Sequence, residues 1–229
     1  MEKAFVSWSS GKDGAFALYE ARRFGLADIA GVLVVINEKY DRVAMHGVRH
    51  DFLNRQIEAL NLPAIKVLIP SPCPNETYEA RMAEACAALR ARGVFNIVFG
   101  DLFLEDIRTY REDKLSSVGM RGLFPLWRRD TGSLAREMID AGLIAHLVCV
   151  DPKQLDKSFA GRRFDHSLLA RLPHCVDPCG ENGEYHTVVS AGPMFSRPIE
   201  VSVGAVVERD GFVFADVSAA DETASAWRL

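Results

Sequence analysis

The chain has 229 residues, a formal net charge of −4, and a composition that is 48% hydrophobic and 25% charged. This length is sufficient for a hydrophobic core without disulfides or metals. The acidic balance, without a basic stripe, argues against a nucleic-acid binder.

The cysteines and the apolar segments indicate a cytoplasmic protein. The five cysteines are odd in number and irregularly spaced, so they do not form a disulfide framework and fit a reducing compartment. The longest apolar stretch, Ile29–Ile36, is too short to span a bilayer. The chain begins directly with a predicted strand rather than a leader. We therefore expect no membrane partner.

The first 100 residues alternate between short apolar runs and segments with helical periodicity. Apolar runs are typical of strands buried on both faces, and their alternation with helices implies right-handed crossovers. The predicted fold is α/β, a doubly wound parallel sheet that binds ligands at the carboxyl ends of its strands. Strands are expected at Ala4–Trp8, Ile29–Ile36, Ala64–Ile69 and Asn96–Phe99, and helices at Lys12–Phe24, Val48–Leu60 and Thr77–Arg92.

The alternation loosens after Gly100, which predicts a second, smaller α+β domain. We place the boundary so that residues 1–127 form the nucleotide domain and residues 128–229 the acceptor-substrate domain, with disorder only in the tail after about Ala219. The expected elements are a helix at Glu105–Gly119, an apolar run at Gly122–Leu126, a helix at Ser133–Ala141 that begins on a Ser/Thr cap, a strand at Leu143–Val150, loops holding Phe159–Phe164 and Pro178–Thr187, and a hairpin of Val201–Arg209 with Phe212–Val217.

The segment Ser9–Gly14 has the pattern of a phosphate-binding loop. A strand, a turn of small residues and a helix start present backbone N–H groups and a positive dipole end to an anion. Lys12 adds charge, and Asp13 is placed to hold a metal ion that bridges phosphates. The sequence matches neither GxxxxGK[ST] nor GxGxxG. A plain strand-to-helix turn remains the alternative.

Two further polar segments follow predicted strands. Gly100 and Asp101 close the fourth strand, and Glu105, Arg108 and Glu112 recur at helical spacing after them. They form either part of a ligand site or a solvated face with internal ion pairs. The second segment, Asp177–Thr187, crowds Glu, Asn, Tyr, His and Thr around two glycines. Core packing does not require this composition, which favours a functional loop over a surface hairpin.

These segments resemble a known family. Ser9–Gly14 is similar to the SGGxDS PP-loop of the ATP pyrophosphatases, the adenine nucleotide alpha-hydrolase-like (HUP) fold. Ser10 stands for a glycine, which its small size makes tolerable, and Gly14 replaces the closing serine. Together with MHGVR at Met45, GDLFLEDIR at Gly100, LDKSFAGRRFD at Leu155 and CGENGEYHT at Cys179, the loop resembles the diphthine–ammonia ligase family over residues 4–200.

The resemblance implies a ligase that activates a carboxylate with ATP and Mg²⁺, releases AMP and pyrophosphate, and amidates the product with ammonia. The acceptor would be a small molecule or a protein-borne carboxylate, such as that of a modified elongation factor. It implies that phosphates and Mg²⁺ are held by Ser9, Ser10, Gly11, Lys12, Asp13 and Gly14. It places the rest of the nucleotide near Val35, Ile36, Asn37, His46, Gly47, Gly100 and Asp101. It assigns the acceptor or ammonia to Gly180, Glu181, Asn182, Gly183, Glu184, Tyr185 and His186, beside the charged helix with Glu105, Arg108 and Glu112. Of these, Lys12, Asp13, Asp101, Glu184 and His186 are the candidate catalytic residues.

Several alternatives stay open at this level. One alternative is an ATP pyrophosphatase with another acceptor, as in cofactor salvage. A second is a nucleotide sensor without turnover. The least favoured is a tRNA-thiolating enzyme. His186 either moves a proton near neutral pH or is structural. A zinc site of His174, Cys175, Cys179 and His186 has unusual spacing. Pairing of the C-terminal hairpin leaves an oligomer open.

Overall fold

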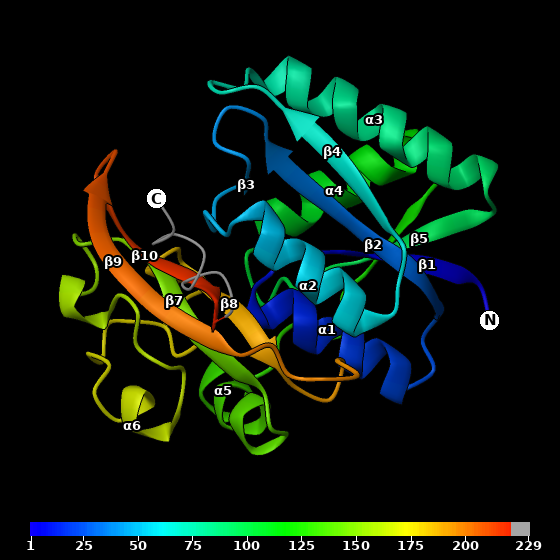
Figure 1. Cartoon of the computed structure of the whole chain (residues 1–229). Coiled ribbons are helices and arrows are strands. Elements are labelled where there is room, and N and C mark those ends of the chain that lie inside the picture. The colour runs from blue at the N-terminus through cyan, green and yellow to red at the C-terminus, as the bar shows by residue number, and fades with distance from the viewer. Residues whose placement is uncertain (221–229) are drawn as a thin grey trace. The chain divides into compact units, whose positions relative to one another are not determined.

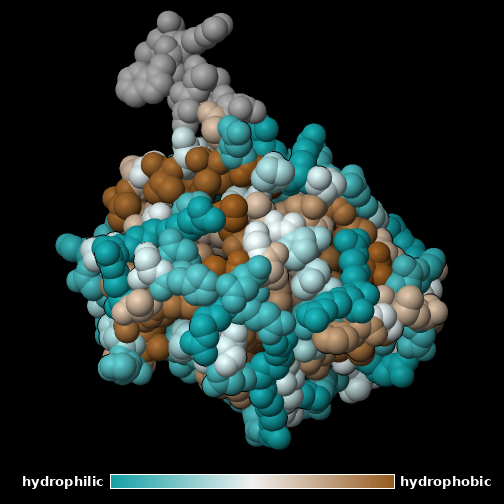
Figure 2. Space-filling view, turned by 90° about the horizontal axis from the view of Figure 1, so that it is seen from below, coloured by the Kyte–Doolittle hydropathy of each residue, from teal (hydrophilic) through white to brown (hydrophobic). Residues whose placement is uncertain are grey.

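The structure is a computed structural model that describes residues 1–220. Residues 221–229, which hold the expected tail and the end of the expected C-terminal domain, lie outside the described part of the chain. None of the helices in the described part combines the length and hydropathy that crossing a bilayer demands. On the face seen in Figure 2, hydrophilic side chains are interspersed with separate hydrophobic patches.

The chain divides into two compact units that are not continuous in sequence. The first contains Met1–Ser9, Asp13–Ala44 and Leu62–Arg129. The second contains Ser10–Lys12, Met45–Asn61 and the chain from Asp130 onward. The phosphate-loop segment Ser9–Gly14 therefore belongs partly to each unit. The domain boundary between residues 127 and 128 stays a prediction.

The first unit is built on a largely parallel sheet in the order β4-β2-β1-β5-β6, with β3 antiparallel to the end of β2. Helices α3 and α4 lie on one face of this sheet and α1 on the other (Figure 1). The strands are β1 (Lys3–Ser7), β2 (Asp28–Asn37), β3 (Arg42–Val43), β4 (Ala64–Ile69), β5 (Val94–Val98) and β6 (Arg121–Leu123), and the helices α1 (Lys12–Arg23), α3 (Asn75–Ala91) and α4 (Glu105–Ser117).

The predicted doubly wound sheet is present in this unit. After β1 the chain adds β2 and then β4 on one side, and β5 and β6 are added on the other. The order therefore reverses between β1 and β5, which is where such sheets bind ligands. Apolar side chains such as Phe5, Leu33, Leu89, Ile97 and Phe99 form the core.

The second unit contains an antiparallel sheet in the order β8-β7-β10-β9 (Figure 1). Helix α2 is tied to this unit by hydrogen bonds from Ser196 to Ala59 at its C-terminal end. The elements are α2 (His50–Leu60), α5 (Thr131–Asp140), β7 (Ile144–Val150), the 3₁₀ turn η1 (Lys157–Phe159), α6 (His166–Leu169), β8 (Tyr185–Ala191), β9 (Val201–Arg209) and β10 (Phe212–Ala219).

The predicted elements agree with the structure to within one or two residues at their ends, with four differences. Residues 185–187, expected in a loop, begin strand β8. Helix α5 is capped by Asp130, whose carboxylate accepts from the Ser133 N–H at 2.8 Å, rather than by Ser or Thr. Strand β4 is not buried on both faces, because Lys66 and Leu68 are exposed. The short elements β3, β6, η1 and α6 were not predicted as helices or strands.

Candidate functional site

The turn between β1 and α1 has a strained backbone at Ser10. Ser10 adopts φ 70°, the left-handed region that favours glycine. Its side chain is fully buried, and the hydroxyl oxygen has no hydrogen-bond partner in the described part of the chain. The small size of serine, which makes the replacement tolerable, does not remove the conformational cost of this backbone. A strained backbone with an unsatisfied buried hydroxyl is typical of a functional loop.

Gly100 lies against the opposite end of the same loop, within the first unit. A Cβ added to Gly100 would be 2.6 Å from the carbonyl carbon of Asp13 and from the nitrogen of Gly14. Only glycine therefore lets the end of β5 approach the first turn of α1. The structure brings two sequence-predicted segments, the phosphate loop and the Gly100 motif, into direct contact.

The tip of the loop, Ser10–Lys12, is fixed to strand β8. The Val189 N–H donates to the Ser10 carbonyl at 2.9 Å. The Lys12 N–H donates to the Thr187 hydroxyl at 3.1 Å. The side-chain amide of Gln56, fully buried on α2, donates to the carbonyls of Ser10 at 3.2 Å and Val189 at 2.6 Å. The tip of the phosphate loop and the end of the CGENGEYHT motif are thus joined by hydrogen bonds within the second unit.

Two histidines flank this tip. The His46 and His186 rings lie 4.8 Å apart, and His46 Nδ1 is 2.8 Å from the Thr187 carbonyl, to which it donates. A Cβ on Gly11 would be 2.5 Å from the His46 ring. Burial, the neighbouring His186 and Lys12 lower the pKa of His46 to about 3. Burial and Lys12 lower the pKa of His186 to about 4.

Neutral imidazoles bear on the proton-transfer hypothesis for His186. A pKa of about 4 leaves His186 uncharged near pH 7, and both roles considered from the sequence, proton transfer and a structural role, stay predictions. A neutral ring still donates from one nitrogen and accepts at the other.

Lys12 is buried among residues of the second unit. Its side chain is 1% exposed, and its ammonium donates to the Cys179 carbonyl. It lies 5.5 Å from the centre of the Tyr185 ring and 5.6 Å from that of Phe164. The positive charge that the sequence assigned to the phosphates is therefore held beside the CGENGEYHT motif.

The loop that carries this motif is braced by its own polar groups. One Asp177 carboxylate oxygen accepts from the N–H groups of Cys179 and Glu181, at 3.1 and 3.0 Å. Glu184 Oε1 accepts from the Asp177 N–H at 2.8 Å and from the Asn182 amide at 3.1 Å. Glu184 is 1% exposed, and its Oε2 has no hydrogen-bond partner among residues 1–220.

Other members of this loop also shape it. The Tyr185 hydroxyl donates to the Pro178 carbonyl at 2.6 Å. Gly180 and Gly183 have φ of 70° and 83°. A Cβ on Gly180 would be 2.9 Å from the Tyr185 carbonyl. Several residues predicted to bind the acceptor therefore have a structural role as well.

Asp101 and the charged face of α4 are largely engaged in ion pairs. Asp101 pairs with Arg111 at 2.7 Å. Arg108 pairs with Glu112 at 2.9 Å and stacks on the Phe124 and Trp127 rings, each 4.7 Å away, and Glu105 pairs with Arg128. An open cavity of about 420 Å³ remains here, lined by Glu105, Arg108, Thr109, Glu112, Trp127 and Arg128.

The end of β2, where adenine was expected, is hydrogen-bonded along both edges. Val35, Ile36 and Asn37 pair with β4 on one side. On the other side the Val35 carbonyl accepts from the Ala44 N–H at 3.0 Å, and β3 pairs with Ile36 and Asn37. Gly47 packs on Phe214 within the second unit.

No metal cluster is evident in the part of the chain that is described. Within residues 1–220 no three His, Cys, Asp or Glu side chains are placed to share an ion. His174, Cys175, Cys179 and His186, considered for zinc, form no such group. Asp13 remains the predicted metal residue.

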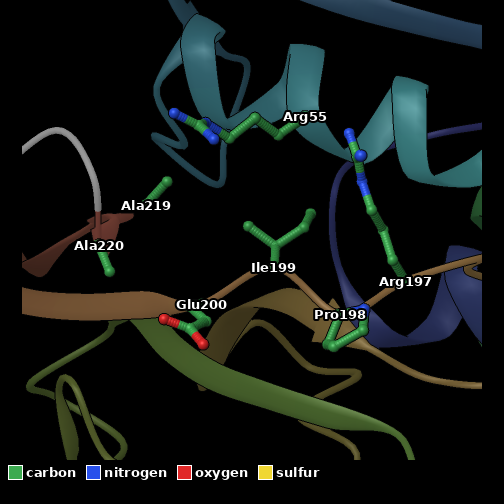
Figure 3. Close-up of a pocket in the computed structure, with 7 residues that line it drawn as sticks. All are labelled: Arg55, Arg197, Pro198, Ile199, Glu200, Ala219 and Ala220. Atoms are coloured by element: carbon green, nitrogen blue, oxygen red, sulfur yellow. The ribbon is translucent and has the colours of Figure 1, made fainter.

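A separate cavity of about 310 Å³ lies in the second unit, away from the predicted residues. Figure 3 shows Arg55 reaching it from α2, and Arg197 and Ile199 from the segment before β9. Arg197 also pairs with Glu58 at 3.2 Å. No motif in the sequence indicated this cavity.

Comparison with known proteins identifies the family. Residues 2–122 match the model of the diphthamide synthase N-terminal domain, and residues 130–218 match that of the C-terminal domain. The chain belongs to the diphthamide synthase family. The N-terminal match contains the phosphate loop, and the C-terminal match contains the CGENGEYHT motif. The resemblance stated from the sequence is therefore confirmed.

The relatives in this family are diphthine–ammonia ligases. That of Schizosaccharomyces pombe is 27% identical over 219 residues, 87% of this chain but 36% of its own length. That of Danio rerio is 26% identical, covering 91% of this chain and 90% of its own. The Rattus norvegicus protein is 31% identical over 80% of this chain and 74% of its own. This chain thus spans about a third of the S. pombe protein.

Two residues with clear roles were missed by sequence reasoning. Gln56 is a single polar residue in an amphipathic helix, and its partners lie 46 and 133 residues away. Asp177 directly precedes Pro178 and was included only as the start of a polar loop. An Asp followed by Pro favours a turn, and this pattern could have indicated the bonds of Asp177 to the Cys179 and Glu181 N–H groups.

Proposed function

We propose that this chain is an ATP-dependent carboxylate–ammonia ligase, acting like a diphthine–ammonia ligase. The observation that carries the proposal is the turn after β1, where Ser10 is held at φ 70° with a buried hydroxyl that lacks a partner within residues 1–220. Such a turn at the switch point of a parallel sheet suits an anion. The ligases found among the relatives favour this reading over a sensor or a thiolating enzyme.

The proposed reaction has two balanced steps. A carboxylate oxygen of the acceptor attacks the α-phosphorus of ATP, forming an acyl-adenylate and releasing pyrophosphate. The nitrogen of ammonia then attacks the acyl carbon, the bond to AMP breaks, and a proton is lost to solvent. The protein's task is to position the reactants and to stabilise negative charge.

The phosphate loop is proposed to bind the nucleotide. A side chain at Gly11 or Gly100 would clash with neighbouring atoms. Because both residues are glycine, their backbone can pack closely at the loop. The Ser10 hydroxyl would donate to a phosphate oxygen. Asp13 would hold Mg²⁺, which would supply positive charge to the phosphates, since Mg²⁺ needs few protein carboxylates when phosphates and water complete its shell.

The acceptor and ammonia are proposed to bind beside the CGENGEYHT motif. Glu184 Oε2 is a buried acceptor without a partner in the described chain, which suits a small donor such as ammonium. His186, held neutral, would accept a hydrogen bond from the attacking nitrogen. The charged α4 residues and their cavity are a second candidate surface for the acceptor.

The finer parts of this proposal concern the acceptor and the compartment. The names of the relatives indicate diphthine as the acceptor. We propose that an elongation factor carries it. A cytoplasmic location is supported by the five cysteines, all of which are free. No nucleic-acid or membrane partner is proposed.

The experiment that tests the proposal uses an elongation factor bearing diphthine, with ATP and ammonium. Conversion of the carboxylate to an amide changes the mass of the factor, and ¹⁵N-ammonium should label it. The Asp13→Ala variant should fold and fail to form AMP. An unlabelled factor together with AMP formation would redirect the search to another acceptor.

A further inference from the structure

The left-handed turn at Ser10 needs restraint from its surroundings. A non-glycine residue in this conformation is strained, and such strain persists where neighbouring groups hold it in place. Ser10 is fully buried, so water does not supply the restraint. The groups that hold its backbone must therefore come from the protein.

Gln56 is the side chain that meets this need. Its amide nitrogen lies 3.2 Å from the Ser10 carbonyl and 2.6 Å from the Val189 carbonyl, and the Val189 N–H donates to the same Ser10 carbonyl at 2.9 Å. These bonds close a triangle between α2, β8 and the loop. Gln56 is fully buried. A shift of the loop by about an ångström would stretch each of these hydrogen bonds beyond its usual length and break it.

We propose that Gln56 is a positioning residue of the nucleotide site, which holds the Ser10 carbonyl and thereby keeps the phosphate loop in its left-handed, ligand-ready turn. This inference rests on the proposed nucleotide site. The chemistry of the residue is specific, since the amide nitrogen supplies two donors to two carbonyls. A carboxylate would place an acceptor against two acceptors, and an apolar side chain would leave both carbonyls without it.

The test replaces Gln56 by methionine, which has a similar shape but no donors. The KM for ATP in AMP formation should rise about tenfold, because the loop spends less time in its bound conformation. The matched control is Ser196→Ala, which removes a 2.8 Å hydrogen bond from the Ser196 hydroxyl to the Ala59 carbonyl at the end of the same helix. The control should lower thermal stability and leave the KM unchanged. Equal KM values in both variants would overturn the proposal.

A double-mutant cycle separates positioning from general destabilisation. Glycine adopts φ 70° without restraint, so Gln56→Met should cost clearly less affinity in a Ser10→Gly background than in the natural sequence. Additive effects would contradict a role exerted through Ser10.

Hydrogen exchange keeps the inference testable if the enzyme forms no AMP. The Lys12 amide, bonded to the Thr187 hydroxyl at 3.1 Å, should exchange about tenfold faster in Gln56→Met and at its natural rate in Ser196→Ala. Unchanged protection of the Lys12 amide in Gln56→Met would contradict the inference, whatever the nucleotide chemistry. Absence of AMP formation with the expected exchange would count against the proposed function alone.

Discussion

Ser10 has features that lower the stability of the fold and that we propose serve nucleotide binding. Its φ of 70° costs conformational energy, and its hydroxyl is buried without a partner within the described chain. Both features disfavour the folded state in the absence of a ligand. They make sense if the hydroxyl gains a phosphate oxygen when nucleotide binds. The same residue should therefore affect stability and affinity in opposite directions.

Ser10→Gly should raise the free energy of unfolding by about 1 kcal/mol and weaken ATP binding. Glycine removes the strain and the unsatisfied hydroxyl together, whereas the phosphate loses a donor. Urea unfolding and calorimetric titration measure the two effects. Asp210→Gly is the matched control, since Asp210 has φ 53° in an exposed turn and takes no part in the site. A destabilised Ser10→Gly protein would contradict the account of strain.

At this scale the sequence indicated residue types better than their partners. Ser9–Gly14 and Cys179–Thr187 were singled out because small and polar residues gathered there. Gln56 gave no signal, because a polar residue on a helix is ordinary and its hydrogen bonds depend on long-range packing. The departure at Ser10 was noticed, but its backbone conformation was not predictable from the size of the side chain. The site assignments themselves stay predictions.

At the scale of elements, the contact of β5 with the start of α1 determines where the loop lies. The Gly100 backbone fits against Asp13 and Gly14 because it lacks a Cβ. The apolar runs and helical periods of the first 100 residues predicted these elements well. Strand β8 was missed because its polar start, Tyr185–Thr187, continued a polar loop and hid the apolar residues that follow.

Gly100→Ala should push the first turn of α1 away from β5. The added methyl group would meet backbone atoms at 2.6 Å, and backbone moves less readily than a flexible side chain. We expect a loss of about 1–3 kcal/mol in the free energy of unfolding and at least tenfold weaker ATP binding. Gly132→Ala, whose Cβ would have no neighbour closer than 3.6 Å, is the control. Natural ATP affinity in Gly100→Ala would refute this packing argument.

At the scale of the whole molecule, the units do not follow the order of the sequence. Ser10–Lys12 and Met45–Asn61 group with the second unit, although a sequence pattern can only propose cuts between continuous stretches. Composition and periodicity therefore predicted the sheet and the looser second part, but could not assign α2 or the loop tip to a unit. Long-range hydrogen bonds such as that of Val189 to Ser10 decide this.

The two neutral histidines should make the folded protein sensitive to acid. Their pKa values in the folded state, about 3 for His46 and about 4 for His186, lie below the ordinary value of 6.5. Between pH 6.5 and about 4 these histidines bind protons in the unfolded chain but stay neutral in the folded chain. The free energy of unfolding therefore falls as the pH falls. Each histidine contributes at most about 1.4 kcal/mol per pH unit.

Urea unfolding at several pH values between 7.5 and 4.5 measures this dependence. His186→Gln should flatten it by removing one of the titrating groups. Nucleotide phosphates bound nearby should raise both pKa values and reduce the acid sensitivity. A free energy of unfolding that stays constant from pH 7 to pH 5 would show that these rings are not held neutral.

The most direct test of the central claim is to incubate the purified protein with ATP and Mg²⁺ and to identify the nucleotides by mass spectrometry. The account predicts AMP and pyrophosphate, formed faster when carboxylate acceptor and ammonium are present and absent from the Asp13→Ala variant. ADP and phosphate as the products would contradict it, because cleavage between the β- and γ-phosphates forms no acyl-adenylate.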